Sequence, residues 1–132
     1  RGRVMHEGAP YVQDVVIAGH DRADIGLLII PNLVQCRELA GLPPSSAAAE
    51  VLASSPVRGY FQDLVDRLWR QGSGSATRVV RALLLEQPPS IDRGEITDKG
   101  SINQRAVLSH RAHLVELLYA GLDPAIFHAR TD

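Results

Sequence analysis

The fold is decided by residues 11–31, which read YVQDVVIAGHDRADIGLLIIP. Two short apolar runs, residues 11–19 and 26–31, carry the Val, Ile and Leu residues that favour largely buried strands. The polar residues 20–24 between them form a connection short enough to join neighbouring strands. We therefore predict an adjacent pair of strands, most simply antiparallel.

Helices are predicted before and after this pair. A short helix over residues 3–9 ends at Pro10, and another over residues 33–40 ends at Gly41. The strongest helix covers residues 57–71, where apolar residues recur every three or four positions. Its other side carries charges and is expected to face solvent: Arg58, Asp63, Asp66, Arg67 and Arg70.

The second half of the chain adds one more strand and one more long helix. Residues 42–49, rich in Pro, Ser and Ala, predict a loop with about one helical turn, and residues 76–86 predict a third strand. Residues 103–119 predict one amphipathic helix, followed by a short tail. Its apolar side is expected to consist of Val107, Leu108, Ala112, Val115 and Tyr119. The sum is an α+β fold with a small mixed sheet of about three strands flanked by helices.

Composition limits the class of protein. The chain has 132 residues, 45% of them apolar, which suffices for one core, so we treat residues 1–132 as one domain. The net charge of -1 and the charged fraction of 22% favour neither a disordered acidic chain nor a nucleic-acid binder. No apolar run reaches the roughly 18 residues that a membrane span needs. Because the single Cys36 excludes an internal disulfide, we expect a cytoplasmic protein. The start at Arg1 suggests a piece of something larger.

Three residues at intervals of three raise the question of a metal site. His110, His113 and Glu116 lie on the predicted last helix, and His with carboxylate is a possible ligand set. They belong, however, to the side opposite the apolar stripe, which is expected to be solvated. We predict no metal site.

Other polar groups have structural interpretations. His20 with Asp21 and Asp24 is typical of a turn in which Asp satisfies its own backbone. The segment GSGS at residues 72–75 fits neither a phosphate loop nor a nucleophile elbow, so we interpret it as a connector. Cys36 lies inside a predicted helix and is interpreted as a buried or idle thiol.

Lys99 is the one basic residue that stands apart. Of the fourteen basic residues thirteen are Arg, and Lys99 is the only Lys. A codon bias toward Arg would explain this pattern, and so would a site that needs a compact ammonium on a thin stem instead of a planar guanidinium. Lys99 lies in the polar loop EITDKGS, residues 95–101, directly before the last helix. From there a lysine could reach a partner surface.

The string ITDKGSINQR, residues 96–105, resembles the closing core motif of the adenylate-forming acyl-CoA synthetases, in which a threonine precedes an essential lysine. Residues 10–31 are similar to that family's helix, proline and strand pair. The spacer at residues 42–56 and the string GEITDKG at residues 94–100 most resemble the feruloyl-CoA synthase branch. The family more often places glycine before the lysine, whereas here Asp98 precedes it and Gly100 follows.

The resemblance implies that residues 1–132 are the small C-terminal lid subdomain of an acyl-CoA synthetase, without the large N-terminal domain. It implies that Lys99 contacts the carboxylate and the α-phosphate during adenylation, and that the subdomain then rotates for thioester formation with coenzyme A. ATP and Mg would be bound mainly by the large domain, and the acid would be ferulate or a related aromatic acid. No residues for binding the cofactors can be assigned, and the separate subdomain is expected to be inactive.

Two interpretations from other classes stay open. The chain could be a stand-alone protein-interaction module with exposed helix faces. It could also be a small ligand-binding domain, which predicts a deep apolar pocket within these residues.

Overall fold

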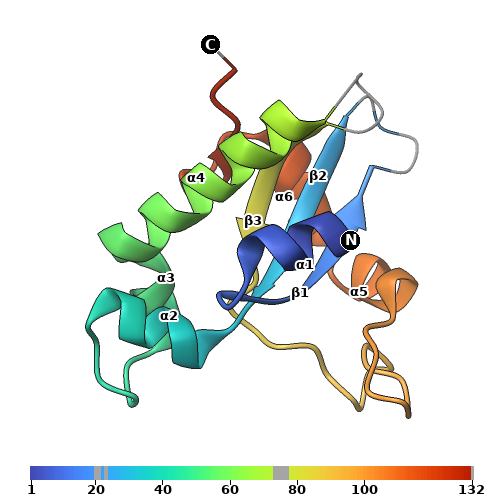
Figure 1. Ribbon diagram of the computed structural model, residues 1–132. Helices are drawn as coiled ribbons and strands as arrows, with labels where there is room; N and C mark the ends of the chain where they lie inside the picture. The colour runs from blue at the N-terminus through green and yellow to red at the C-terminus, as the bar shows by residue number, and fades with distance from the viewer. Residues whose placement is uncertain (20–21, 23, 73–77, 132) are drawn as a thin grey trace.

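The computed structural model describes residues 1–19, 22, 24–72 and 78–131. It confirms the predicted class, with a small sheet between two groups of helices (Figure 1). In chain order the elements are α1 (Gly2–Gly8), β1 (Val12–Ala18), β2 (Ile25–Pro31), α2 (Leu33–Ala40), α3 (Ala48–Ala53), α4 (Ser55–Gln71), β3 (Val79–Leu84), α5 (Gln104–His110), α6 (Ala112–Ala120) and β4 (Phe127–His128).

The sheet has the strand order β1-β2-β3-β4. β1 and β2 pair antiparallel, as predicted, and β3 and β4 also pair antiparallel. β2 and β3 are parallel, with Leu27 beside Ala82. Parallel neighbours need a crossover, and α2, α3 and α4 supply it.

Helices cover both faces of the sheet (Figure 1). On one face, the side chains of α1 to α4 pack against strand residues such as Val15 and Ile29. On the other face, Val107 of α5 and Leu118 of α6 pack against Val16 and Leu28. Because β2 contributes to both cores, it reads as an uninterrupted apolar run in the sequence.

One predicted surface charge on α4 is buried. Asp66 was expected on the solvated side of this helix, but it is only 4% exposed. Its carboxylate accepts hydrogen bonds from the Arg130 backbone N–H at 2.8 Å and from the Arg130 guanidinium at 2.8 Å. Asp66 therefore fastens the C-terminal segment to α4, a long-range contact that helical periodicity does not predict.

The last predicted helix is two helices. Residues 103–119 were expected to form one helix, but the chain breaks at Arg111, which has φ −112° and ψ 32°. The Arg111 side chain is held by contacts outside the helix, described below. The buried residues also differ from those expected. Leu118 is fully buried, whereas Ala112, which was expected on the apolar side, is exposed.

Two further elements differ from the prediction. The helical turn expected within residues 42–49 is the helix α3, which begins at Ala48 and extends to Ala53, and α4 begins at Ser55, with Pro56 in its first turn, where the missing N–H costs nothing. The expected tail contains the fourth strand, β4, which has only two residues and pairs with Arg81 and Ala82.

Cys36 is fully buried in α2, as predicted, and burial raises its pKa to about 11. We expect a thiol-specific disulfide reagent to leave Cys36 unmodified in native buffer at neutral pH, because the thiolate is both scarce and inaccessible. The absorbance of the thiolate that the reagent releases on reaction with Cys36 should rise only when guanidinium chloride unfolds the chain. Fast labelling in native buffer would contradict the packing described here.

None of the helices within the described residues is both long enough and apolar enough to span a membrane.

Candidate functional site

Lys99 lies at the tip of a small hairpin between β3 and α5. The hairpin is closed by an antiparallel bridge between Ile96 and Ile102, and the Thr97 N–H donates to the Ser101 carbonyl at 2.8 Å. Lys99 is exposed, and across the described part of the chain its ammonium has neither a hydrogen bond nor an ion pair. An outward-facing cation of this kind is available to a group on another surface.

Gly100 fixes the turn that presents Lys99. The Gly100 N–H donates to the Thr97 carbonyl at 2.9 Å, so Asp98 and Lys99 occupy the two central positions of a β-turn. Gly100 itself has φ +81°, a left-handed conformation that favours glycine. This explains why glycine follows the lysine in this chain: the position after Lys99 is the one where the backbone needs it.

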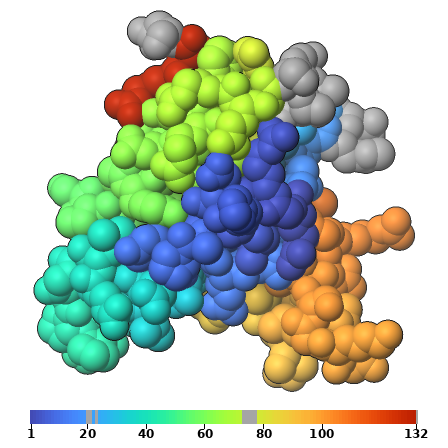
Figure 2. Space-filling model, viewed as in Figure 1, coloured from blue at the N-terminus to red at the C-terminus, as the bar shows by residue number. Residues whose placement is uncertain are grey.

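The segment that carries the hairpin extends beyond the sheet. In Figure 1 the connection from β3 to α5 runs past the end of the strands, on the side away from α4. In the space-filling view of Figure 2, the gold and orange atoms of this region form a separate projection from α2 and α3. The placement favours contact of the hairpin with a second body.

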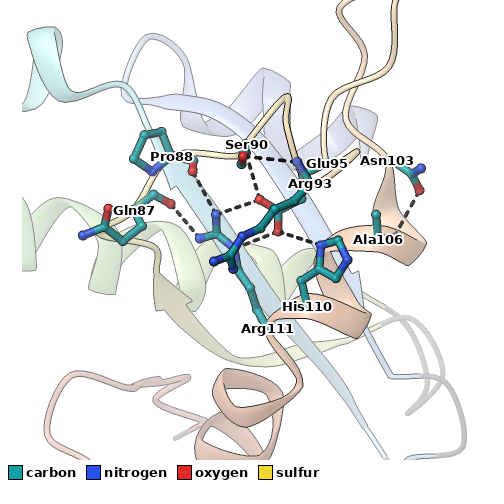
Figure 3. A network of polar contacts seen from close by, with 9 residues as sticks. All are labelled: Gln87, Pro88, Ser90, Arg93, Glu95, Asn103, Ala106, His110 and Arg111. Carbon is teal, nitrogen blue, oxygen red and sulfur yellow. Dashed lines mark hydrogen bonds and ion pairs between the residues drawn. The ribbon is translucent and has the colours of Figure 1, made fainter.

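A buried ion pair lies directly below the hairpin (Figure 3). Glu95 is 1% exposed. The Arg111 guanidinium donates two hydrogen bonds of 3.0 Å to its carboxylate, one to each oxygen. The Ser90 N–H adds a hydrogen bond of 2.8 Å to Oε1, and His110 Nδ1 lies 4.0 Å from Oε2. Arg111 also donates through Nη1 to the Gln87 carbonyl at 2.6 Å and through Nη2 to the Pro88 carbonyl at 2.9 Å.

The pKa of Glu95 lies below its usual value. Hydrogen bonds from the Arg111 side chain are the largest cause, burial acts in the opposite direction, and the Ser90 N–H and the charge of Arg111 add to the lowering. Glu95 is therefore ionised at neutral pH, and its charge is matched by Arg111. These properties suit a structural anchor and not a proton donor or acceptor.

The other limb of the hairpin is anchored to the sheet. Gln104, at the start of α5, donates through Nε2 to the Val15 carbonyl at 2.8 Å. Its Oε1 accepts from the Ile17 N–H at 3.0 Å. The side-chain amide thus pairs with the outer edge of β1, as a neighbouring strand would.

An open groove of about 810 Å³ runs beside the ion pair. Its lining includes leucines of β3 and α6, but also Glu95, His110 and Arg111. It is not the deep apolar pocket that the small ligand-binding interpretation predicts.

The residues considered for a metal site do not come together. His110 faces Glu95, whereas Glu116 forms an ion pair with Arg22 at 2.6 Å. Within residues 1–19, 22, 24–72 and 78–131, no cluster of three or more His, Cys, Asp or Glu could hold a metal ion.

Two of the sequence interpretations fall partly outside the described residues. The turn with His20 and Asp21 and the connector at residues 73–75 both lie in undescribed positions. Asp24 is described, and its carboxylate lies 3.4 Å from Arg81.

Sequence reasoning missed Glu95, Arg111 and Gln104. One signal was available for Arg111, because it lies four residues after Val107 and seven before Leu118, within the buried stripe of the last helices. A charge in an apolar stripe indicates a buried partner. Nothing in the spacing identifies that partner as Glu95.

Comparison with known protein families gives a match over most of the chain. The model of the AMP-binding enzyme C-terminal domain matches residues 2–123. The chain belongs to this family. The resemblance to adenylate-forming enzymes is thus confirmed at the level of the family. No curated protein matches the sequence.

Solved relatives of this C-terminal domain share its fold. The A-PCP didomain of carboxylic acid reductase from Segniliparus rugosus, in complex with AMP, has a TM-score of 0.58 and 20% identity, with 90% of this chain and 16% of that chain covered. The adenylation domain of the carboxylate reductase from Mycobacterium chelonae has a TM-score of 0.56 and 19% identity, with coverage of 90% and 17%. The C-terminal domain thus spans less than a fifth of these solved chains.

Proposed function

We propose that this chain is the mobile C-terminal subdomain of an ATP-dependent acyl-CoA ligase, and that Lys99 is its catalytic residue for adenylation. The observation that carries the proposal is the exposed ammonium at the tip of a hairpin whose base is held by a buried ion pair. Family membership supports an adenylate-forming context.

In the first half-reaction, a carboxylate oxygen of the acid attacks the α-phosphorus of ATP. The bond to the β-phosphate oxygen breaks, and acyl-AMP and pyrophosphate form. This reaction brings two anions together, so a preorganised cation stabilises the transition state. We assign that role to Lys99, whose compact ammonium can enter a narrow site between the carboxylate and the α-phosphate.

In the second half-reaction, the thiol of coenzyme A attacks the acyl carbon, the bond to AMP breaks, and the thiol proton passes to solvent. We propose that the subdomain rotates between the two steps, so that Lys99 leaves and another face completes the thiol site. The partner is a large N-terminal domain of the same polypeptide. That domain binds the acid and ATP and supplies most of the ligands of Mg²⁺.

For the acid we propose ferulate or a related aromatic acid. The support is the sequence resemblance of residues 42–56 and 94–100 to the feruloyl-CoA synthase branch. Because the acyl pocket belongs to the large domain, residues 1–132 do not bear on the choice of acid directly. We propose the cytoplasm as the location, since the one cysteine forms no internal disulfide.

The proposed function is tested with the enzyme that contains this subdomain and its large domain. Ferulate, ATP and Mg²⁺ should give feruloyl-AMP and pyrophosphate, and addition of coenzyme A should give feruloyl-CoA, detected by liquid chromatography. Acetate is the control acid and should react poorly. Absence of acid-dependent pyrophosphate release with every aromatic acid tried would contradict the proposal. If the acyl group is transferred to a carrier-bound thiol and not to coenzyme A, only the proposed acceptor is wrong, and the proposed adenylation stands.

A further inference from the structure

We propose that Glu95 is a positioning residue, which acts through Arg111 to hold the base of the hairpin so that Lys99 is presented in one orientation. This inference rests on the proposed function, because it assigns to Glu95 a part in the step that Lys99 catalyses.

Glu95 is joined to the hairpin by its backbone as well as by its side chain. It directly precedes the bridge between Ile96 and Ile102, and its carbonyl accepts from the Asn103 N–H at 2.8 Å, across the base of the hairpin. Its N–H donates to the Ser90 carbonyl at 2.9 Å. A shift of Glu95 would therefore shift both limbs of the hairpin.

Arg111 ties this base to the body of the subdomain. Its guanidinium spans Glu95 and the carbonyls of Gln87 and Pro88, so the segment after β3, the hairpin and the junction of α5 and α6 meet at one side chain (Figure 3). The planar fork of arginine fixes the angle between these segments as well as their distance.

Stability alone does not account for such a pair. The two side chains are 1% and 11% exposed, and burial of an ion pair costs desolvation that its attraction does not reliably offset. Replacement of a buried ion pair by apolar residues of similar volume is often neutral or stabilising in proteins. What the pair adds is a unique geometry, and the element whose geometry it sets carries Lys99.

A catalytic cation needs that geometry. Misplacement of a reacting group by about 1 Å can lower a rate by about 100-fold. Lys99 is a central residue of the β-turn, and its side chain has no hydrogen bond or ion pair with the described residues. Its orientation relative to the subdomain is therefore set at the base, by Glu95 and Arg111 on one limb and by Gln104 on the other.

The test is a double-mutant cycle in the full-length enzyme, measured by pyrophosphate release. Glu95→Gln keeps the size and one acceptor oxygen but removes the charge, and we expect it to lower the adenylation rate about 10- to 100-fold. In the Lys99→Ala background the same change should have no further effect, because Glu95 acts through Lys99. Thioester formation from supplied acyl-adenylate should stay unchanged in Glu95→Gln.

The matched control is Asp66→Asn, which removes the charge of another buried carboxylate bound to an arginine, Arg130. It should leave the adenylation rate near the native value. Equal losses from Glu95→Gln and Asp66→Asn, or equal losses from Glu95→Gln with and without Lys99, would assign Glu95 a merely structural role and overturn the inference.

Arg111→Lys provides a second variant where Glu95→Gln does not fold. It keeps the charge but loses the fork, and should give the same selective loss in adenylation. Failure of both variants to fold would overturn the positioning role. A native adenylation rate in Lys99→Ala would instead refute the proposed function. If Lys99→Ala loses adenylation activity but a folded Glu95→Gln keeps the native rate, only the role of Glu95 is refuted.

Discussion

Replacement of Lys99 by alanine is expected to lower the rate of acyl-adenylate formation by a factor of about 100 to 1,000, the loss that follows removal of one preorganised electrostatic group. The physical reason is that negative charge from the carboxylate and the α-phosphate accumulates where the ammonium would lie. Because Lys99 is exposed and its ammonium has no hydrogen bond or ion pair with the described residues, the substitution should not destabilise the fold. Pyrophosphate release measured at saturating acid and ATP gives the rate.

Lys99→Arg is the matched variant for this experiment. It retains the positive charge but replaces a compact ammonium with a planar guanidinium, which has a different shape and different donor geometry. We expect a rate well below that of the native enzyme, and above that of Lys99→Ala. A native rate in Lys99→Ala would show that no charge at this position is needed.

The second large effect concerns the fold. Phe61 of α4 is fully buried, with its ring centroid 5.2 Å from that of Tyr60 and 6.3 Å from that of Phe127. Phe61→Ala should lower the free energy of unfolding of the chain by about 3–5 kcal/mol, through lost burial and the cavity left behind. Chemical denaturation followed by circular dichroism measures the change.

Leu122→Ala is the control for the same measurement. Leu122 is 90% exposed, so its truncation should change the free energy of unfolding by less than about 0.5 kcal/mol. Similar effects of the two substitutions would contradict the placement of Phe61 between α4 and β4.

The central elements of the fold could be predicted because their burial follows a simple period. The run that became β2 is continuously apolar, the run that became β1 is mostly apolar, and α4 repeats its apolar residues every three or four positions. Such patterns are local and need no knowledge of what lies opposite. β4 was missed because two residues are too few to show a period.

The remaining errors come from contacts between residues distant in sequence. Arg111, where the helix breaks, and the buried Asp66 both form ion pairs, with partners 16 and 64 residues away. A helical pattern assigns charged residues to the solvated side, and it carries no information on a partner that neutralises them.

The site was predictable only in part. Lys99 stood out as the only lysine, and the structure exposes it at a turn. The residues at the base of the hairpin gave no such signal, because Glu95 and Gln104 belong to a polar stretch in which burial is not apparent. The left-handed conformation of Gly100 could be interpreted only once the turn was known.

The central claim is that Lys99 serves the adenylation step and is absent from the thiol step. The most direct measurement is the rate at which full-length Lys99→Ala converts supplied feruloyl-AMP and coenzyme A to feruloyl-CoA. We predict a rate within about twofold of the native enzyme, since the proposed rotation would carry Lys99 away from the reacting atoms. A loss as large as that in adenylation would contradict the account.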